Sequence, residues 1–413
     1  MKPLKKLLII IPFVVGLTLA TIFMPAHAAV PGSAWWDTDY LYRQKITVSS
    51  SGSTAVPDEY SVGFTEDTAS LISAGKLRPD GNDWRIVYWN GSSWVELDRH
   101  VRSGWDSADT EIWFKTQAAI IGGASDDNYY VYYGHPAETG TPPGYWSDSM
   151  GADAHSRVYW CADDFEEHAS GEHPDGWTNQ GGEIFYVALH GSEKWFQVNT
   201  FARWEDGSTA SSMADIGDAV WSARVYYHQA GANAWGGIGA HIYNGNIGRI
   251  VVIRDGGWYQ ADEPDWANPY GGDWQTLTDI HFPIDTKGRL ELITHGTTLD
   301  AYWYNPPGYT LEKVPVFTGV TIPLGIGKLD VHVERPGTDP HSDRWVDADD
   351  IIVRKYVNPE PTVSPGAEEE RPPMTVGGEV YPIDKTALLL PWLSLVAVLV
   401  LAAGGFMLIR RLK

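Results

Sequence analysis

The chain has 413 residues and a formal net charge of −23. Such an acidic surface repels phosphate backbones and anionic lipids, so nucleic acid is not an expected partner. Trp, Tyr, Gly and Pro number 20, 21, 43 and 26, a composition typical of twisted sheets joined by turns rather than of helices. The single cysteine, Cys161, excludes an internal disulfide.

Both ends of the chain carry targeting patterns. Residues 1–28 combine a basic start, an apolar run and Ala26-His27-Ala28, which predicts a cleaved signal peptide. Residues 386–409 contain no charge and precede the basic tail 410–413. A helix of that length spans a bilayer, and the positive-inside rule places the tail in the cytoplasm. We therefore expect a cell-surface protein with one membrane anchor; an uncleaved signal anchor and a buried C-terminal helix are the alternatives.

The first expected domain covers residues 35–137. Residues 42–48 alternate between apolar and polar side chains, as in a half-buried strand. Residues 84–89 and 93–97 flank Asn90-Gly91, a dipeptide typical of a type I′ hairpin turn. Further strands are predicted at 111–116 and 128–133, and a short helix at 67–74. Residues 138–156 are expected to form a linker.

The second expected domain covers residues 157–357. Strand patterns recur there between turn residues, with hairpins predicted at Asn244-Gly245 and His295-Gly296. From 358 to 385 Pro, Glu and Gly replace the strand formers, which predicts an extended linker; a recognition tag for a processing enzyme is the alternative. The fold class we predict is all-β, with two β-sandwich domains followed by this linker and a transmembrane helix.

Two resemblances support this division. The segments WWDTDYLYRQKITV, WRIVYWNGSSWVEL and NYYVYYGHP resemble family 2341 of the domains of unknown function, which occurs in archaeal and bacterial surface proteins. That resemblance implies a β-sandwich at the cell surface and no particular reaction. The segments CADDFEE, RLELITHGTTLDAYWYN and WVDADDIIVRKY resemble strands of concanavalin A-like and laminin G-like jelly rolls, which implies a jelly roll for the second domain.

Familiar catalytic patterns do not occur in the sequence. Jelly-roll hydrolases commonly carry Glu-x-Asp-x-Glu or Glu-x-Asp-x-x-Glu on one strand, and neither pattern is present. No Gly-x-Ser-x-Gly or His-Glu-x-x-His occurs, and the 13 histidines lack zinc-ligand spacing. We therefore expect no enzyme, with a divergent jelly-roll glycoside hydrolase or lyase as an alternative.

Residues 255–274 have the composition of a glycan site. Flat aromatic rings stack on sugar rings while carboxylates accept hydrogen bonds from hydroxyls, and we expect a long loop presenting both groups. The alternative is that the rings seal the loop over its own core. The candidate ligand-binding residues are Trp258, Tyr259, Asp262, Asp265, Trp266, Tyr270 and Trp274.

Acidic residues lie near both ends of the second domain. Asp164 and Glu166 follow its first strand, and Asp347, Asp349 and Asp350 lie in its last. The terminal strands of a jelly roll lie close together, so these oxygens are candidate ligands of a structural Ca²⁺. A solvated strand face is the alternative.

Together these patterns predict a membrane-anchored extracellular binding or adhesion protein that recognises extracellular or cell-surface glycan through its second sandwich. The alternative from a different class is an architectural envelope protein that acts by self-association.

Overall fold

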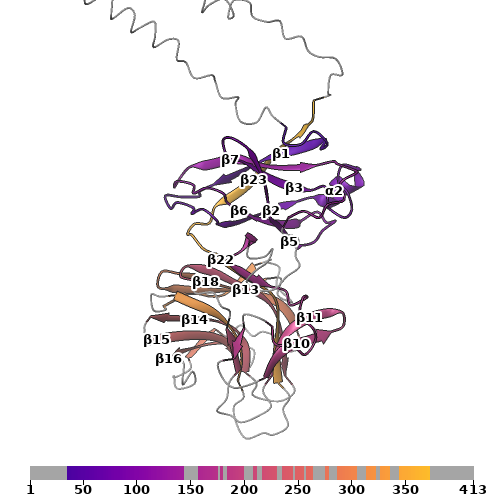
Figure 1. Ribbon diagram of the computed structural model, residues 1–413. Helices are drawn as coiled ribbons and strands as arrows, with labels where there is room; N and C mark the ends of the chain where they lie inside the picture. Colours follow the sequence, from indigo (N-terminus) through magenta and orange to yellow (C-terminus); the bar gives the residue numbers. More distant parts are fainter. Residues whose placement is uncertain are drawn as a thin grey trace, which may run out of the picture. The chain divides into compact units, whose positions relative to one another are not determined.

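The structure of the chain is a computed structural model (Figure 1). It describes residues 35–143, 157–174, 177–179, 184–199, 208–211, 216–229, 235–244, 247–254, 257–263, 275–278, 286–304, 313–321, 326–334 and 344–372. Within these ranges the regular secondary structure is almost entirely β-strand, with one short helix named, α2 (Thr68–Ser73). The predicted all-β fold is confirmed for this part of the chain.

The first sandwich pairs a five-stranded sheet, in the order β23-β1-β7-β3-β4, with a three-stranded sheet, in the order β2-β6-β5. Its strands are β1 (Tyr42–Ser49), β2 (Ser61–Glu66), β3 (Arg85–Trp89), β4 (Trp94–Leu97), β5 (Arg99–Ser103), β6 (Thr110–Lys115), β7 (Ser125–Tyr133) and β23 (Thr362–Glu370).

The core of the first sandwich follows the alternation in its strands. Ile46 and Val48 of β1 are fully buried, and they pack in one cluster with Trp84, Ile112 and residues of β7. Alternate residues of a strand face the same side, so each strand contributes every second side chain to this core. The predicted strands in this region are present.

The hairpin at Asn90-Gly91 forms with a different turn from the predicted type I′. Trp89 pairs with Trp94, so residues 90–93 make a longer loop, and among its residues only Gly91 has a positive φ, 94°. The side-chain Oδ1 of Asn90 accepts hydrogen bonds from the backbone N–H of Ser92 and of Ser93. This side-chain turn replaces the left-handed conformation that a two-residue hairpin requires of Asn.

The second sandwich pairs an eight-stranded sheet with a seven-stranded one. The first has the order β10-β11-β22-β13-β18-β19-β20 with β8 beside β22, and the second the order β17-β16-β15-β14-β21-β12-β9. The strands are β8 (Cys161–Asp163), β9 (Thr178–Asn179), β10 (Ile184–His190), β11 (Glu193–Asn199), β12 (Ser208–Ser211), β13 (Ala219–Gln229), β14 (Trp235–Asn244), β15 (Ile247–Arg254), β16 (Gly257–Glu263), β17 (Gln275–Thr278), β18 (Thr286–His295), β19 (Thr298–Tyr304), β20 (Lys313–Thr321), β21 (Ile326–Glu334) and β22 (Arg344–Lys355).

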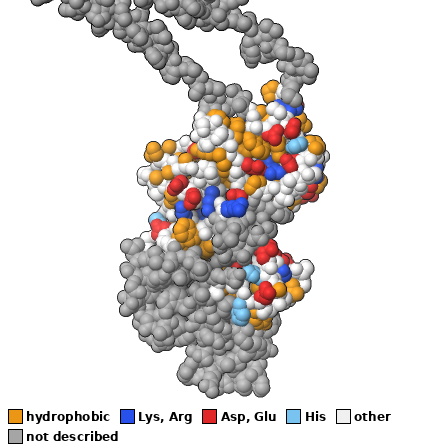
Figure 2. Space-filling view, in the orientation of Figure 1, with side chains coloured by type: hydrophobic (Ala, Val, Ile, Leu, Met, Phe, Trp, Pro, Cys, Tyr) orange, Lys and Arg blue, Asp and Glu red, His pale blue; other side chains and the backbone are white. Residues whose placement is uncertain are grey.

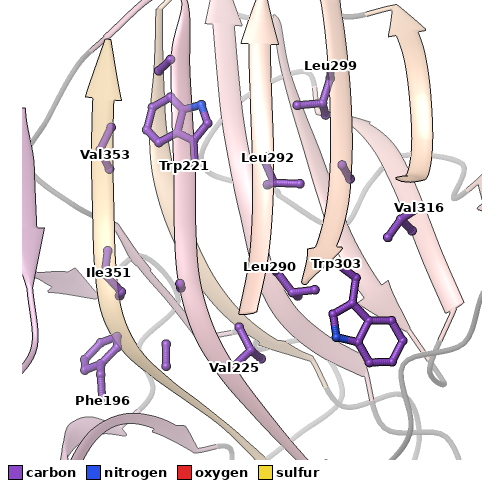
Figure 3. Packing of buried hydrophobic residues seen from close by; sticks show 14 of the residues in the cluster. Phe196, Trp221, Val225, Leu290, Leu292, Leu299, Trp303, Val316, Ile351 and Val353 are labelled. Carbon is purple, nitrogen blue, oxygen red and sulfur yellow. The ribbon is translucent and has the colours of Figure 1, made fainter. Parts of the chain in front are cut away.

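Large apolar side chains fill the core of this sandwich. Trp221 of β13 is fully buried and Trp303 of β19 is nearly so, and both belong to one continuous cluster (Figure 3). Trp221 donates from its indole N–H to Thr294 Oγ1 at 3.2 Å. A buried indole needs such a partner because an unpaired N–H in an apolar core costs free energy.

Residues 358–385, expected to be a linker, instead contribute a strand to the first sandwich. Strand β23 pairs antiparallel with β1, from Ser49 opposite Thr362 to Tyr42 opposite Glu370. Arg43 forms an ion pair with Glu369 at 2.7 Å, and Glu368 contacts Lys76 and accepts from the Tyr133 hydroxyl at 2.7 Å. These partners, supplied by residues far away in the sequence, outweigh the poor strand propensity of TVSPGAEEE.

Polar side chains join the two sandwiches. Arg102 of β5 donates to Ser222 Oγ of β13 at 2.6 Å, and Arg289 of β18 lies 3.4 Å from Glu111 of β6. The Tyr159 hydroxyl lies 2.7 Å from His100 Nδ1. Both sandwiches belong to one compact unit, which ends at Glu370.

The predicted signal peptide and membrane anchor, residues 1–28 and 386–409, lie outside the described residues. Among the residues that are described, no helix has the length and apolar character needed to cross a bilayer.

Candidate functional site

The predicted aromatic loop begins as a strand. Residues 257–263 form β16, which pairs with β15 on one side and β17 on the other. Trp258 and Tyr259 stand opposite Ile253 and Val252 of β15, and Asp262 stands opposite Arg249; their side chains lie outside the described part. The expectation of one continuous loop over 255–274 is therefore wrong, because the strand formers of β15 supply a pairing partner. Asp265, Trp266, Tyr270 and Trp274 lie outside the described residues.

The predicted calcium ligands are only partly brought together. Strand β8 pairs with β22, with Asp163 opposite Ile351, so the first and last strands of the second sandwich are neighbours as predicted. The side chains of Asp164 and Asp349 are buried, at 2% and 4% exposure, and they interact electrostatically with each other and with Asp350. These three carboxyl groups form what we call the acidic cluster.

Glu166 and Asp347 have other partners. Glu166 is exposed, and its Oε1 accepts a hydrogen bond from the backbone N–H of Lys194 at 3.0 Å. Asp347 is fully buried and accepts from Gln197 Nε2 at 2.8 Å. Neither belongs to the acidic cluster, so the five predicted ligands do not form a single set.

A cation of the protein itself already faces the acidic cluster. Arg224 of β13 stands directly opposite Asp349 in the sheet, with Nη2 2.7 Å from that carboxylate and Nε 3.2 Å from Asp350. The same guanidinium reaches Glu193 at 3.3 Å and lies 4.7 Å from the ring centroid of Trp195. Arg224 therefore contacts two of the three carboxyl groups, and its single positive charge is shared between them and Glu193.

Asp164 lacks such a cation. Its Oδ1 accepts from the backbone N–H of Glu166 at 3.1 Å, but its Oδ2 is buried without a hydrogen-bond partner. Burial raises the pKa of Asp164 to about 8, and the negative charges of Asp163 and Asp350 add to that shift. Burial also raises the pKa of Asp349, against the opposing charge of Arg224. Asp164 and Asp349 both have a pKa of about 8, so both favour the protonated form at neutral pH.

These contacts do not make a preformed metal cage. In the part of the chain that the structure describes, no group of three or more His, Cys, Asp or Glu side chains is arranged to hold a metal ion. Ca²⁺ requires six to eight oxygen ligands, and the guanidinium of Arg224 occupies the side of Asp349 and Asp350 that such an ion would need.

A second polar arrangement lies near the same edge of the sheet, and sequence reasoning missed it. His190 Nε2 is 3.0 Å from Asp347 Oδ2, and this carboxylate raises the pKa of His190. Gln197 links Asp347 to Tyr186, whose hydroxyl donates to Gln197 Oε1 at 2.5 Å. No local sequence motif predicts these contacts, because the residues come from β10, β11 and β22. They are neighbours only because these three strands are adjacent in the sheet.

The chain is similar to several solved structures, among them a carbohydrate-binding module and a β-1,3-glucanase. The carbohydrate-binding module CBM66 from Bacillus subtilis is 13% identical over 44% of this chain and 96% of its own, with a TM-score of 0.31. An immunostimulatory antigen and pseudo β-1,3-glucanase of Mycobacterium tuberculosis is 14% identical; the match covers 48% of this chain and 98% of the antigen, with a TM-score of 0.35. A β-1,3-glucanase from Mycobacterium marinum is 14% identical; the match covers 47% of this chain and 98% of the glucanase, with a TM-score of 0.32.

The expectation that this chain is no enzyme is corrected by these similarities. Glucanases and a glycosyl hydrolase stand among the similar structures. The absence of a familiar strand motif was a poor criterion, because hydrolysis depends on where two carboxyl groups lie in space rather than on their spacing in one strand.

No protein-family model and no curated protein matches the chain. The resemblance of the first sandwich to family 2341 of the domains of unknown function is therefore unsupported.

Proposed function

We propose that the chain is a carbohydrate-active surface protein whose second sandwich recognises glycan along β16 and the residues that follow it. The observation that carries this proposal is the pairing of β16 on both sides, which fixes the backbone of Trp258 and Tyr259 within a sheet. Aromatic residues on a fixed backbone lose little conformational freedom on binding. Most of the favourable energy of stacking on a sugar ring therefore contributes to the affinity.

A glycan array probed with the full chain tests this proposal. Trp258→Ala should lower the array signal at least tenfold, which is about the effect of losing one stacking contact. Its melting temperature should stay within about two degrees of the wild type. Ile121→Ala is the matched control, since Ile121 is the most exposed large apolar side chain described, at 78%, and lies on the first sandwich. An array without any glycan signal, or one that Trp258→Ala leaves intact, contradicts the proposal.

The same preparation separates binding from turnover. Glycans that score on the array are incubated with the chain, and release of reducing ends is measured. A hydrolase produces them at a rate proportional to protein concentration, whereas a binding module produces none. Sedimentation of the unliganded chain tests the architectural alternative, which requires self-association without sugar.

We further propose that residues 386–409 anchor the chain in a membrane, on the sequence pattern described above. The test is alkaline extraction of membranes from producing cells. An anchored chain stays in the pellet, and a variant ending at residue 385 is released.

Calcium is proposed only as a structural ligand at Asp164. The unpartnered Oδ2 of this residue, beside Asp350, supports the proposal, and Arg224 opposes it. Thermal melting with Ca²⁺ and with a chelator decides: binding raises the melting temperature in Ca²⁺, and Asp164→Asn abolishes the difference. Identical melts in both solutions remove calcium from the proposal.

A further inference from the structure

The first sandwich contains a cavity that the glycan proposal does not use. Its volume is about 350 Å³, within the range of small-ligand pockets. Strand β4 forms one wall with Val95 and Asp98 just beyond it, and the end of β6 forms another with Lys115. Arg157, which precedes the second sandwich, and Glu59 complete the lining that matters here.

The lining offers both hydrogen-bond donors and acceptors. Lys115 and Arg157 donate, the carboxylates of Glu59 and Asp98 accept, and Val95 adds an apolar surface that is 37% exposed. Arg157 Nη1 lies 3.5 Å from Asp98 Oδ1, which is the outer limit of a hydrogen bond, so a ligand hydroxyl can take the place of this contact. Figure 2 shows the same interspersion of Lys and Arg with Asp and Glu over the described surface of the first sandwich.

The charge of the cavity excludes anionic ligands. Asp58, Glu59, Glu96 and Asp98 line it together with Lys115 and Arg157, and Glu96 is paired with Arg85 at 2.7 Å, so the acidic groups remain in excess. Burial lowers the pKa of Lys115, since its ammonium has lost part of its hydration. A partly desolvated cation among acceptors favours a neutral ligand rich in hydroxyls, because such a ligand replaces the lost water at several points.

Backbone strain marks the same place. Glu59 has a φ of 52°, a left-handed conformation that a residue with a side chain rarely adopts. Its backbone N–H donates to Thr116 O at 2.9 Å, which fixes the turn between the cavity and β6. Strained residues cluster at ligand sites because the surrounding structure must hold them in place.

A lysine side chain links an exposed aromatic ring to the lining of the cavity. Trp160 is 45% exposed, although indole rings are usually buried. Lys355 connects it to the lining: Nζ lies 5.7 Å from the Trp160 ring centroid and donates to the backbone oxygen of Asp58 at 3.3 Å. An indole face next to a polar cavity suits a ligand that continues past the cavity as a second ring.

We propose that this cavity is a second carbohydrate site, which takes one uncharged sugar unit between Val95, Asp98, Lys115 and Arg157, with Trp160 supporting the next unit of the chain. The site is separate from β16 and does not depend on the function proposed for the second sandwich.

The test is saturation-transfer NMR of the full chain with a panel of neutral methyl glycosides, the corresponding disaccharides, glucuronic acid and glucosamine. At least one neutral glycoside should receive saturation, and glucuronic acid should receive none. Val95→Trp fills the cavity and should reduce the signal at least fivefold. Ile121→Trp adds the same ring at another exposed position of the first sandwich and should leave the signal unchanged.

Two further variants keep the outcome decisive. Trp160→Ala, at an exposed position, should weaken the disaccharide signal and leave that of the methyl glycoside unchanged. Trp258→Ala should leave both signals intact, which distinguishes this site from the proposed site on β16. The proposal is overturned if no neutral glycoside responds, if only glucosamine responds, or if the signal survives in a folded Val95→Trp variant.

Discussion

The buried carboxyl group of Asp164 makes a specific prediction about stability and pH. Its folded pKa is raised from 3.8 to about 8, while an unfolded aspartate titrates near 3.9. Between these values the folded chain holds a proton that the unfolded chain has released. Stability from this group is therefore full below about pH 4, falls as the pH rises, and stops falling above about pH 8.

The magnitude follows from the proton count. One extra proton bound by the native state corresponds to a slope of about −1.4 kcal/mol per pH unit in the free energy of unfolding. Asp163, Glu166, Asp349 and Asp350 interact with the group, and their own titration contributes to the measured curve. Asp164→Asn removes the Asp164 contribution and also the charge through which Asp164 raises the pKa of Asp349, so between pH 5 and 7 the wild-type chain should lose up to about 3 kcal/mol relative to the variant.

Urea unfolding at half-unit pH steps, followed by tryptophan fluorescence in the presence of a chelator, measures this difference. Asp39→Asn, which removes an exposed carboxylate of the first sandwich, should give a curve parallel to the wild type. A constant difference between wild type and Asp164→Asn, or a wild type that gains stability relative to the variant as the pH rises, refutes the assignment of the proton to Asp164.

Two other substitutions test the structure between the sandwiches, each by the midpoint of urea unfolding. Glu360→Ala removes the carboxylate that pairs with the guanidinium of Arg354, which is 5% exposed. Because Glu360 itself is partly exposed, the free energy of unfolding should fall by only about 1 to 3 kcal/mol. The control Glu167→Ala, at an exposed position, should leave it unchanged. Gly63→Ala places a Cβ 2.6 Å from the Trp113 ring and should lower the free energy of unfolding by about 1 to 3 kcal/mol. The control is Gly217→Ala, whose Cβ meets nothing within 4 Å and should cause no such loss. Equal midpoints within either pair contradict the packing described for it.

Local patterns predicted the strands that carry their own signal. The run NYYVYY is part of β7, and the hairpin at His295-Gly296 forms with Gly296 at a φ of 57°. Strand β23 has no such signal, since Pro365, Gly366 and its glutamates disfavour strands. Its conformation depends on β1 and on Arg43 and Lys76, and a sequence window cannot include partners hundreds of residues away.

The acidic cluster likewise has one feature that the sequence predicts and one that depends on long-range pairing. The approach of Asp164 to Asp350 followed from the general rule that terminal strands of such a sandwich are neighbours, and β8 does pair with β22. Arg224 was not predicted, although it decides the electrostatics of the cluster. It meets Asp349 because β13 lies beside β22 in a particular register, which depends on the topology of the whole sheet.

The pairing of β23 makes the second sandwich an insertion within the first. Tyr42 stands opposite Glu370, so the chain begins and completes the first sandwich at neighbouring positions, and both connections of the second sandwich run to the first. Cutting the chain within residues 144–156 should therefore leave two fragments that still associate, through β1 and β23 and through the Arg102–Ser222 contact. A protease site inserted there, cleaved under native conditions and followed by size-exclusion chromatography, should give one peak that holds both fragments. The same nick in a chain lacking residues 362–370 should give weaker association, because the ladder on β1 is then lost. Complete separation of the nicked full-length chain would show that β23 does not hold the two fragments together.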